Sequence, residues 1–319
     1  MRHLNTAIIS FFVSSCLFAA SEHAATVRNS EFSFEPNSIR KRAESVLAMM
    51  SYSVILDLAS SSLSMQNTQS DGETLVMSQL GGGATISDTV PVYLEGAIAY
   101  SRYDPTFVAS NGQESRTIPM KWTTLSVMGG VGWDIPLRED LVLRPIANFS
   151  LGTVQSDLKL INWFLNEKLG TDYNFSHGGS MNALGYGGAL MLDYELVRPE
   201  HEIDLEIRYS AMHLEGFSNG QSIDANADSQ TANIYARYRA PTGLNLFARP
   251  LRYVLEASHS RYYGDQAGQL GFDYLSTLGA GVEVDSTDLI PMITRTRFVA
   301  RYMFGPGVEG AGLSIACSF

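Results

Sequence analysis

The sequence predicts an all-β protein: a transmembrane antiparallel β-barrel of twelve strands, with a short N-terminal helix that can lie inside its lumen. Apolar and polar residues alternate with a period of two from about residue 50 to the last residue, with turn-rich breaks between segments. The chain opens on an export signal, and beyond it no apolar run reaches the ~18 residues of a spanning helix. We expect a signal peptide at 1–21, a segment with a helix at 22–50 and the barrel at 51–319.

The composition excludes several classes of protein. The chain has 319 residues, of which 45% are hydrophobic and 17% are charged, so it is long enough for one large folded domain. Its formal net charge is −11, with 22 lysines and arginines against 33 acids, and no nucleic-acid partner is therefore expected. The two cysteines, Cys16 and Cys317, lie at opposite ends of the chain, so no structural disulfide is expected.

Residues 1–21 have the features of an export signal. A short positive start is followed by an apolar core at 8–18 and small residues at 19–21, which predicts cleavage after Ser21. A second interpretation stays open, because residues 13–16 resemble a lipobox, the motif after which bacterial lipoproteins are cut and acylated on a cysteine, here Cys16.

The alternating segments have the length and the two faces of membrane strands. A soluble β-sandwich also alternates, but its strands have about 5 or 6 residues, whereas a tilted membrane strand needs roughly 9 to 11. Several segments, such as 90–103 and 121–137, are longer than that. One face is apolar with aromatic residues near segment ends, and the other holds charges of both signs among small residues. We expect the first face to contact lipid and the second to line a lumen.

Twelve segments are expected to be strands, an even number as in single-chain bacterial barrels. With the C-terminus in the periplasm, the longer connections at 105–120, 155–182, 217–230 and 264–273 all lie outside the cell. Pro145 cannot donate a ladder hydrogen bond, and it predicts a bulge. The twelve segments are 54–66, 73–80, 90–104, 121–137, 140–154, 183–197, 202–216, 231–241, 251–263, 274–286, 295–305 and 310–319.

A helix is expected at residues 37–50, before the first strand. Arg40, Lys41 and Arg42 crowd its first turn, against the helix dipole, so nearby acids would stabilise it. Inward-facing acids could supply that charge if the helix lies in the lumen, and a helix in the periplasm or on anionic lipid is the alternative. These acids are Glu95, Asp193, Asp204, Glu206, Glu256 and Glu283.

The charges predicted for the inner face are mixed in sign. A selective channel uses rings of one sign, whereas a near balance favours internal ion pairs that brace the wall or hold a plug. The candidate lumen charges are Glu95, Arg144, Asp204, Glu206, Arg208, Arg237, Glu256, Arg297 and Arg301.

The signal, the helix, the twelve strands and the final alternation ending at Phe319 together resemble the translocator barrel of autotransporters, over residues 35–319. More narrowly, the chain resembles a solitary autotransporter-type barrel without its large passenger. The resemblance implies a monomeric integral protein in the outer membrane of a Gram-negative bacterium, in contact with outer-membrane lipid. In it, Phe319 resembles the signal that is read by the barrel-assembly machinery.

The chain departs from that family in two ways. Only a short stretch precedes the first strand, which leaves no room for a passenger. Self-cleaving members are cut between Asn and Asp in the helix, whereas here Asn37 is followed by Ser38. We therefore expect neither passenger export nor self-cleavage, and a barrel plugged by its helix is the simpler picture. A small general or solute-specific pore is the alternative.

An outer-membrane hydrolase is the second alternative. A phospholipase needs a serine and a histidine within hydrogen-bonding distance on the lipid-facing wall. His259 is predicted to face outward near an external loop, but neighbours on a strand face opposite ways, so Ser258 and Ser260 cannot partner it.

The other histidines are no more specific. His213 and His177 lie at the level of external loops and could join Asp172 or Asp224 in a water-activating site, although nothing in their spacing selects them. The sequence shows no spacing typical of metal ligands, and we expect no cofactor and no enzymatic activity.

Overall fold

The computed structural model describes most of the barrel and part of the N-terminal segment. The described residues are 8–11, 62–67, 74–87, 89–104, 106–110, 115–119, 122–156, 180–218, 221–246, 249–268, 271–287 and 294–318, together with Glu44, Leu47, Ala48, Met50, Ser51 and Tyr52. Predictions for Cys16, Arg40, Lys41, Arg42, Asp172, His177 and Phe319 lie outside them.

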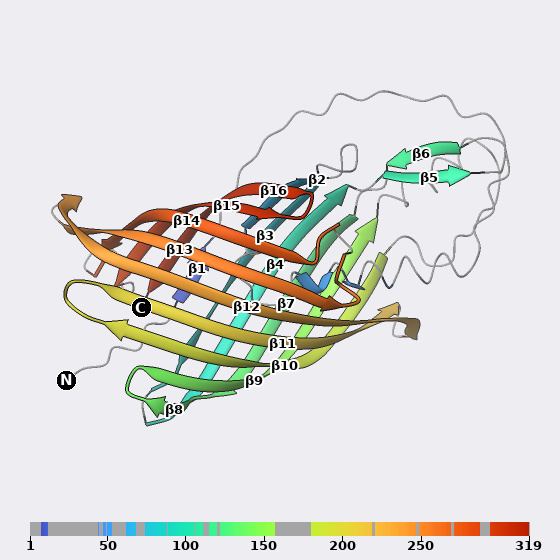
Figure 1. The fold of residues 1–319 in the computed structure, drawn as a ribbon. Coiled ribbons are helices and arrows are strands. Elements are labelled where there is room, and N and C mark those ends of the chain that lie inside the picture. Colours follow the sequence, from blue (N-terminus) through green and yellow to red (C-terminus); the bar gives the residue numbers. More distant parts are fainter. Residues whose placement is uncertain are drawn as a thin grey trace.

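Twelve strands of the described chain follow one another around a single antiparallel sheet (Figure 1). The last strand also pairs with the first, with Val308 opposite Asn67, so the ladder closes into a barrel. Each strand corresponds to one predicted segment, which confirms the predicted fold class. The strands are β2 (Ser62–Asn67), β3 (Thr74–Thr85), β4 (Val92–Asp104), β7 (Trp122–Trp133), β9 (Leu141–Ser156), β10 (Ser180–Val197), β11 (Glu202–Ser218), β12 (Gln221–Leu246), β13 (Arg249–Gly264), β14 (Tyr274–Asp285), β15 (Arg295–Gly305) and β16 (Val308–Ser318).

Four more short strands complete the described sheet structure: two form a separate sheet, and two belong to the barrel sheet. β5 (Thr106–Ser110) and β6 (Ser115–Pro119) form a two-stranded sheet of their own within the predicted external connection after β4. β8 (Ile135–Arg138) continues β7 along β9. β1 (Ile8–Phe11) fills the seam of the barrel, between β16 and β3, over the part that the described β2 does not reach.

The alternation works as the sequence predicts. Along β15, Arg297, Val299 and Arg301 are buried, while Phe298 and Tyr302, which point to the other face, are exposed. A strand presents successive side chains to opposite faces, so one face of the closed sheet becomes the lumen and the other an apolar outer wall. Other exposed apolar residues of that wall include Leu94, Ile98, Val127, Phe149, Leu151 and Leu313.

Two predicted connections are wrong. The predicted loop at 217–230 is almost entirely strand, because β11 continues to Ser218 and β12 starts at Gln221. The connection between the predicted strand segments 231–241 and 251–263 is also mostly strand, since β12 runs to Leu246 and β13 starts at Arg249, with a shift of register between Pro241 and Asn245. The first stretch is polar, as a loop would be, but a strand outside the membrane has no need of an apolar face. The second stretch contains Pro241, Gly243 and Pro250, which are typical of turns, beside the exposed Leu244 and Leu246.

The bulge expected at Pro145 is also wrong. Pro145 pairs with Leu190 of β10 in an unbroken register. On its other side, the pairing of β9 with β7 stops at Ile146, and the pairing with β8 resumes at Leu143. The proline therefore interrupts the ladder without a bulge, which fits a residue that lacks the N–H donor. The register shift on this edge falls between Pro136 and Arg138.

Candidate functional site in the barrel lumen

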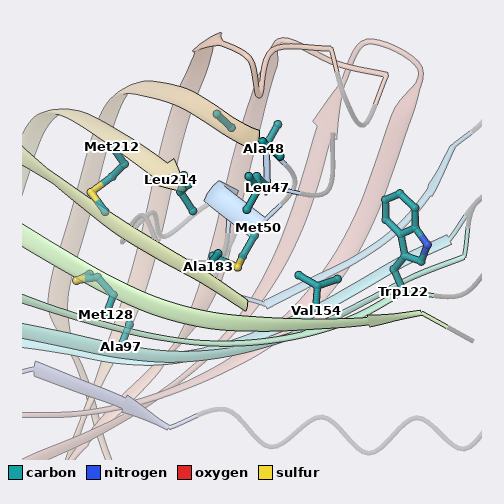
Figure 2. Packing of buried hydrophobic residues seen from close by; sticks show 12 residues of the cluster. Leu47, Ala48, Met50, Ala97, Trp122, Met128, Val154, Ala183, Met212 and Leu214 are labelled. Carbon is teal, nitrogen blue, oxygen red and sulfur yellow. The ribbon is translucent and has the colours of Figure 1, made fainter. Parts of the chain in front are cut away.

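The helical residues of the N-terminal segment lie inside the barrel. We call Glu44, Leu47, Ala48, Met50, Ser51 and Tyr52 the lumen helix. Leu47, Ala48 and Met50 are fully buried and pack on inward-facing side chains of β4, β7, β9, β10, β11 and β12 (Figure 2). Tyr52 packs on a second cluster, from β3, β13, β14, β15 and β16. The lumen helix therefore contacts opposite sides of the barrel.

A turn at the end of the barrel ties the lumen helix down. The Ser51 hydroxyl donates a hydrogen bond to the side-chain oxygen of Gln266 (2.6 Å), and the Tyr52 hydroxyl donates one to the Gln266 main-chain oxygen (2.7 Å). The Gln266 amide in turn donates to the Gln230 carbonyl and to the Thr231 hydroxyl. Burial, with a contribution from the nearby Asp273 carboxylate, raises the pKa of Tyr52 well above its usual value, so the phenol stays a hydrogen-bond donor at neutral pH.

A glycine in the wall leaves space for the lumen helix. A Cβ at Gly152 on β9 would stand 2.5 Å from the Met50 sulfur, too close for any side chain, whereas a Cβ at Gly216 on β11 would make an ordinary contact with Leu47 Cδ1 at 3.7 Å. Glycine inside a strand is unfavourable in itself and often marks the close approach of another part of the chain. Here that part is the lumen helix.

Two groups of buried charges brace the wall between β4 and β11. Arg208 on β11 reaches across the lumen to Glu95 on β4, with its two terminal nitrogens 2.8 and 2.7 Å from the two carboxylate oxygens. Asn148 also donates to Glu95 (2.6 Å). In the second group, Arg144 on β9 bonds Asp134, between β7 and β8, and lies 3.1 Å from an oxygen of Asp193 on β10. Such bidentate and shared geometry is what a buried ion pair needs to offset its desolvation.

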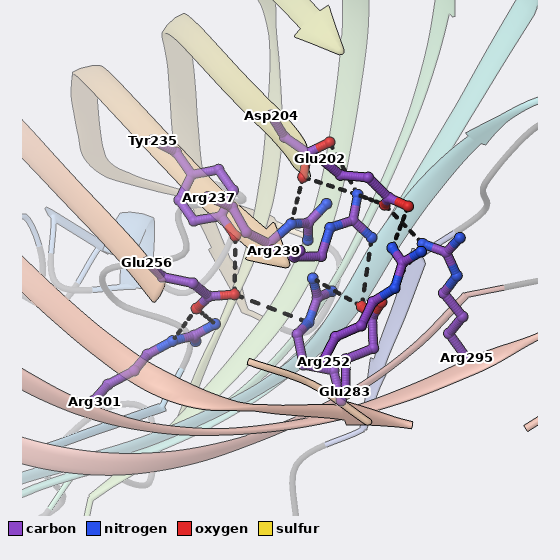
Figure 3. A network of polar contacts seen from close by, with 11 residues as sticks. Glu202, Asp204, Tyr235, Arg237, Arg239, Arg252, Glu256, Glu283, Arg295 and Arg301 are labelled. Carbon is purple, nitrogen blue, oxygen red and sulfur yellow. Dashed lines mark hydrogen bonds and ion pairs between the residues drawn. The ribbon is translucent and has the colours of Figure 1, made fainter. Parts of the chain in front are cut away.

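A larger group, which we call the arginine cluster, covers the wall from β11 to β15 (Figure 3). Its hub is Glu202, which bonds Arg252 and lies 2.9 Å from Arg239 and 2.7 Å from Arg295. Asp204 pairs with Arg237 (2.6 Å) and with Arg239. The members are Arg237, Arg239, Arg252, Arg295, Arg297, Arg301, Glu202, Asp204, Glu256 and Glu283.

The nine candidate lumen charges all lie on the inner face. Eight of them are buried, and Glu206, which is half-buried, has the same orientation on β11. Five of the acids suggested as partners for the basic turn of the helix pair with arginines of the wall, namely Glu95, Asp193, Asp204, Glu256 and Glu283. Whether they also face the basic turn stays a prediction, because that turn lies outside the described residues. Sequence reasoning missed Glu202, Arg295 and Gln266 as partners. Glu202 could have been found, since it shares the inner face of β11 with Asp204.

The outer wall carries a histidine and a serine that contact one another. His259 is exposed, and Ser258 and Ser260 are buried on the other face, as the alternation predicts. The cross-strand neighbour of His259 is Ser276 on β14, and its Oγ lies 2.9 Å from His259 Nδ1. Among the described residues no carboxylate is bonded to this histidine, so they contain no third member of a catalytic triad.

His213 lies in a second polar group on the outer wall. Its Nδ1 is 2.6 Å from an Asp228 oxygen, and its Nε2 is 3.4 Å from Glu215. Among the described side chains its partner is therefore Asp228, while Asp172 and the side chain of Asp224 lie outside the described part of the chain. Within the described part of the chain, no group of histidine, cysteine and acidic residues could hold a metal ion.

A closed antiparallel barrel with an apolar outer wall and a charged, braced interior defines an integral outer-membrane protein of Gram-negative bacteria. None of the helical residues described belongs to a helix long and apolar enough to cross a membrane.

Several solved structures of β-barrels are similar to this chain. The chain is similar to the β-domain of the Bordetella autotransporter BrkA, with 14% identity, TM-score 0.45, and 80% of this chain and 93% of that chain covered. The transport unit of the Escherichia coli autotransporter AIDA-I gives 13% identity and TM-score 0.43, with coverage of 90% and 98%. The translocator domain of NalP from Neisseria meningitidis gives 9% identity and TM-score 0.42, with coverage of 89% and 95%. No protein-family model matches the sequence, and no curated protein matches it significantly.

Proposed function

We propose that this protein is a non-enzymatic outer-membrane barrel that its own N-terminal helix closes, similar to an autotransporter translocator but with no large passenger to export. The observation that carries the proposal is the burial of Leu47, Ala48, Met50 and Ser51, each with 0% of its surface exposed. Leu47, Ala48 and Met50 pack on one side of the lumen, and Tyr52 packs on the opposite side.

The size of the barrel supports a closing role for one helix. Barrels of about 8 strands are filled by their own side chains, whereas porins of about 16 leave an aqueous channel. Twelve strands lie between these limits, so one helix together with the braced side chains is enough to fill the lumen. The mixed signs of the wall charges also favour a braced interior over an ion-selective path.

Conductance measurements test the proposal directly. In planar bilayers we expect the mature protein to be closed for most of the time, and we expect deletion of residues 22–52 to open a stable aqueous pore. Deletion of residues 106–119 is the control, because it removes β5 and β6, which form a sheet separate from the barrel. Heat-modifiable gel mobility checks that both variants fold. Equal conductance of the mature protein and the 22–52 deletion would leave a small general or solute-specific pore as the better account.

A further inference from the structure

The arginine cluster contains more positive than negative charge. Its six arginines face four acids (Figure 3). The next acid, Glu195 on β10, interacts electrostatically with Arg237 and Arg239 and lowers the excess to one. Arg249 and Asp285 pair with one another at the rim, 3.9 Å apart, and leave the balance unchanged. Within the described arginine cluster, one positive charge therefore has no matching acid.

The unmatched charge falls on Arg297. Its side chain is 4% exposed, and it reaches Glu256 and Glu283 only at 3.9 Å, beyond hydrogen-bonding distance. Within the described chain, its buried Nη1 has no hydrogen-bond partner. The two acids are engaged elsewhere, because Glu256 binds Arg301 (2.8 Å) and Glu283 lies 3.4 Å from Arg239.

The neighbouring strands place no acidic side chain other than Glu283 directly opposite Arg297. Its cross-strand neighbours are Glu283 on β14 and Ala316 on β16, and the alanine is buried with no polar side-chain atom. Arg239, which flanks the same Glu283 oxygen, also has a buried nitrogen, Nε, without a described partner. A guanidinium cannot shed its proton at any ordinary pH, so burial of its nitrogens without a hydrogen-bond acceptor costs free energy that neutralisation cannot remove.

We propose that Arg297 anchors a site for one small oxyanion in the lumen, a sulfate, a phosphate or the carboxylate of a small solute. The oxyanion accepts hydrogen bonds from the Arg297 guanidinium and supplies the missing negative charge. Arg239 provides a second donor on the far side of Glu283. The site lies in the wall and not on the lumen helix, so it does not depend on the proposed closure of the barrel.

Titration of the mature protein with sodium sulfate tests the site, with sodium acetate as a second arm and sodium chloride at matched ionic strength as the reference. We expect sulfate or acetate to raise the midpoint of thermal unfolding with a saturable dependence on concentration. The Arg297→Gln variant should fold without the anion and should lose this response, with affinity at least about tenfold weaker. Arg261→Gln is the control, because Arg261 is exposed and pairs with Asp273 at 3.7 Å on the rim.

Ala316→Asp provides a test that keeps Arg297. An aspartate at 316 stands directly opposite Arg297 and should replace the anion, which abolishes the response to sulfate, whereas Ala316→Asn should retain it. Crystals soaked in selenate should show an anomalous peak within hydrogen-bonding distance of Arg297. No saturable response to either oxyanion, or the same response in Arg297→Gln, would overturn the proposal and leave water or an acid of the chain as the partner.

Discussion

The Met50 sulfur lies 2.5 Å from the point at which a side chain on Gly152 would begin. Gly152→Val should therefore push the lumen helix away from β9, increase the time the barrel spends open in bilayer recordings and lower stability by about 1–3 kcal/mol. Gly129→Val is the matched control, since a Cβ at Gly129 meets nothing within 4 Å. Normal closure of the Gly152→Val barrel would place the helix elsewhere.

Alkaline pH should release the lumen helix through Tyr52. Burial raises the pKa of the Tyr52 phenol, so its contribution to stability is complete below the unfolded value of about 10 and is lost as pH rises above that. Bilayer conductance and unfolding midpoints should therefore change more steeply between about pH 9 and 12 in the native protein than in Tyr52→Phe. Tyr52→Phe should itself cost about 1 kcal/mol at neutral pH, because the bond to the Gln266 carbonyl is lost. Identical pH profiles would remove Tyr52 from the account.

The histidine and serine on the outer wall should not be catalytic. We expect purified protein in lipid to release no fatty acid and to cleave no peptide, and we expect His259→Ala, Ser276→Ala and His213→Ala to be silent. The physical reason is that His259 lacks an orienting carboxylate among the described residues. Labelling of Ser276 by a fluorophosphonate, or turnover that His259→Ala abolishes, would make the protein a hydrolase.

Assembly should depend on the last residue of the chain. Deleting Phe319, or changing it to Ser, should reduce the heat-modifiable form in outer-membrane fractions and leave degraded or periplasmic material, because the terminal alternation resembles the signal of barrel assembly. Ser318→Ala serves as the control, since it changes the neighbouring residue and keeps the aromatic end. Unchanged amounts of folded barrel after deletion would show that the assembly machinery does not need Phe319.

Removal of the export signal should take β1 out of the barrel, and another segment should then pair with β16 and β3 in its place. Ile9 of β1 lies opposite Cys317 on one side and Gly82 on the other. In the described pairing, Met65 of β2 lies opposite Gly310 of β16, and Leu63 lies opposite Met77 of β3. If β2 extended toward the N-terminus in both of these registers, position 58 would lie opposite Cys317 and Gly82, where Ile9 lies now. We expect residues 57–60 to take that place in the mature protein.

A cysteine at position 58 tests the exchange. Leu58→Cys should form a disulfide with Cys317 in the mature protein, visible as a change of gel mobility that a reductant reverses, because the Cα atoms of directly opposed residues lie about 4.5–5.5 Å apart, within the range that a disulfide spans. Ala59→Cys is the control, since its side chain faces the other side of the strand. No disulfide in Leu58→Cys, or equal yields in both variants, would reject this register.

Which residues face the lumen could be predicted from the sequence, because a period of two leaves only one choice of face for each strand. Arg297 and Arg301 on β15, and Asp204 and Arg208 on β11, all point inward as expected. Their partners could not be predicted. Arg208 meets Glu95 on the far wall, and such a contact depends on the curvature of the whole sheet and on the register of every strand between them.

The limits of the strands were less predictable outside the membrane. The alternation of small buried and polar residues continues at Ala225 and Ala227, but the polar composition there is also that of a loop. A strand that faces lipid needs apolar residues on one face, and the resulting alternation of apolar and polar residues identifies it in the sequence. A strand surrounded by water does not need this alternation, so the sequence does not reveal it. Helix contacts such as Met50 with Gly152 carry no local signal either, since glycine in a strand has several causes.

β12 has 26 residues, and at about 3.3 Å per residue it is roughly 85 Å long, far more than the 9 to 11 residues that cross a bilayer. Its neighbours β11 and β13 keep pairing with it along most of that length. On this side the protein meets its surroundings as a stiff ribbon, with its backbone groups engaged in the ladder. A protease must bind an extended, unpaired stretch of chain. During digestion of whole cells, β11, β12 and β13 should therefore be cleaved more slowly than the connection after β4, which contains β5 and β6. Antibodies against these three strands should recognise the folded sheet and fail on the boiled protein.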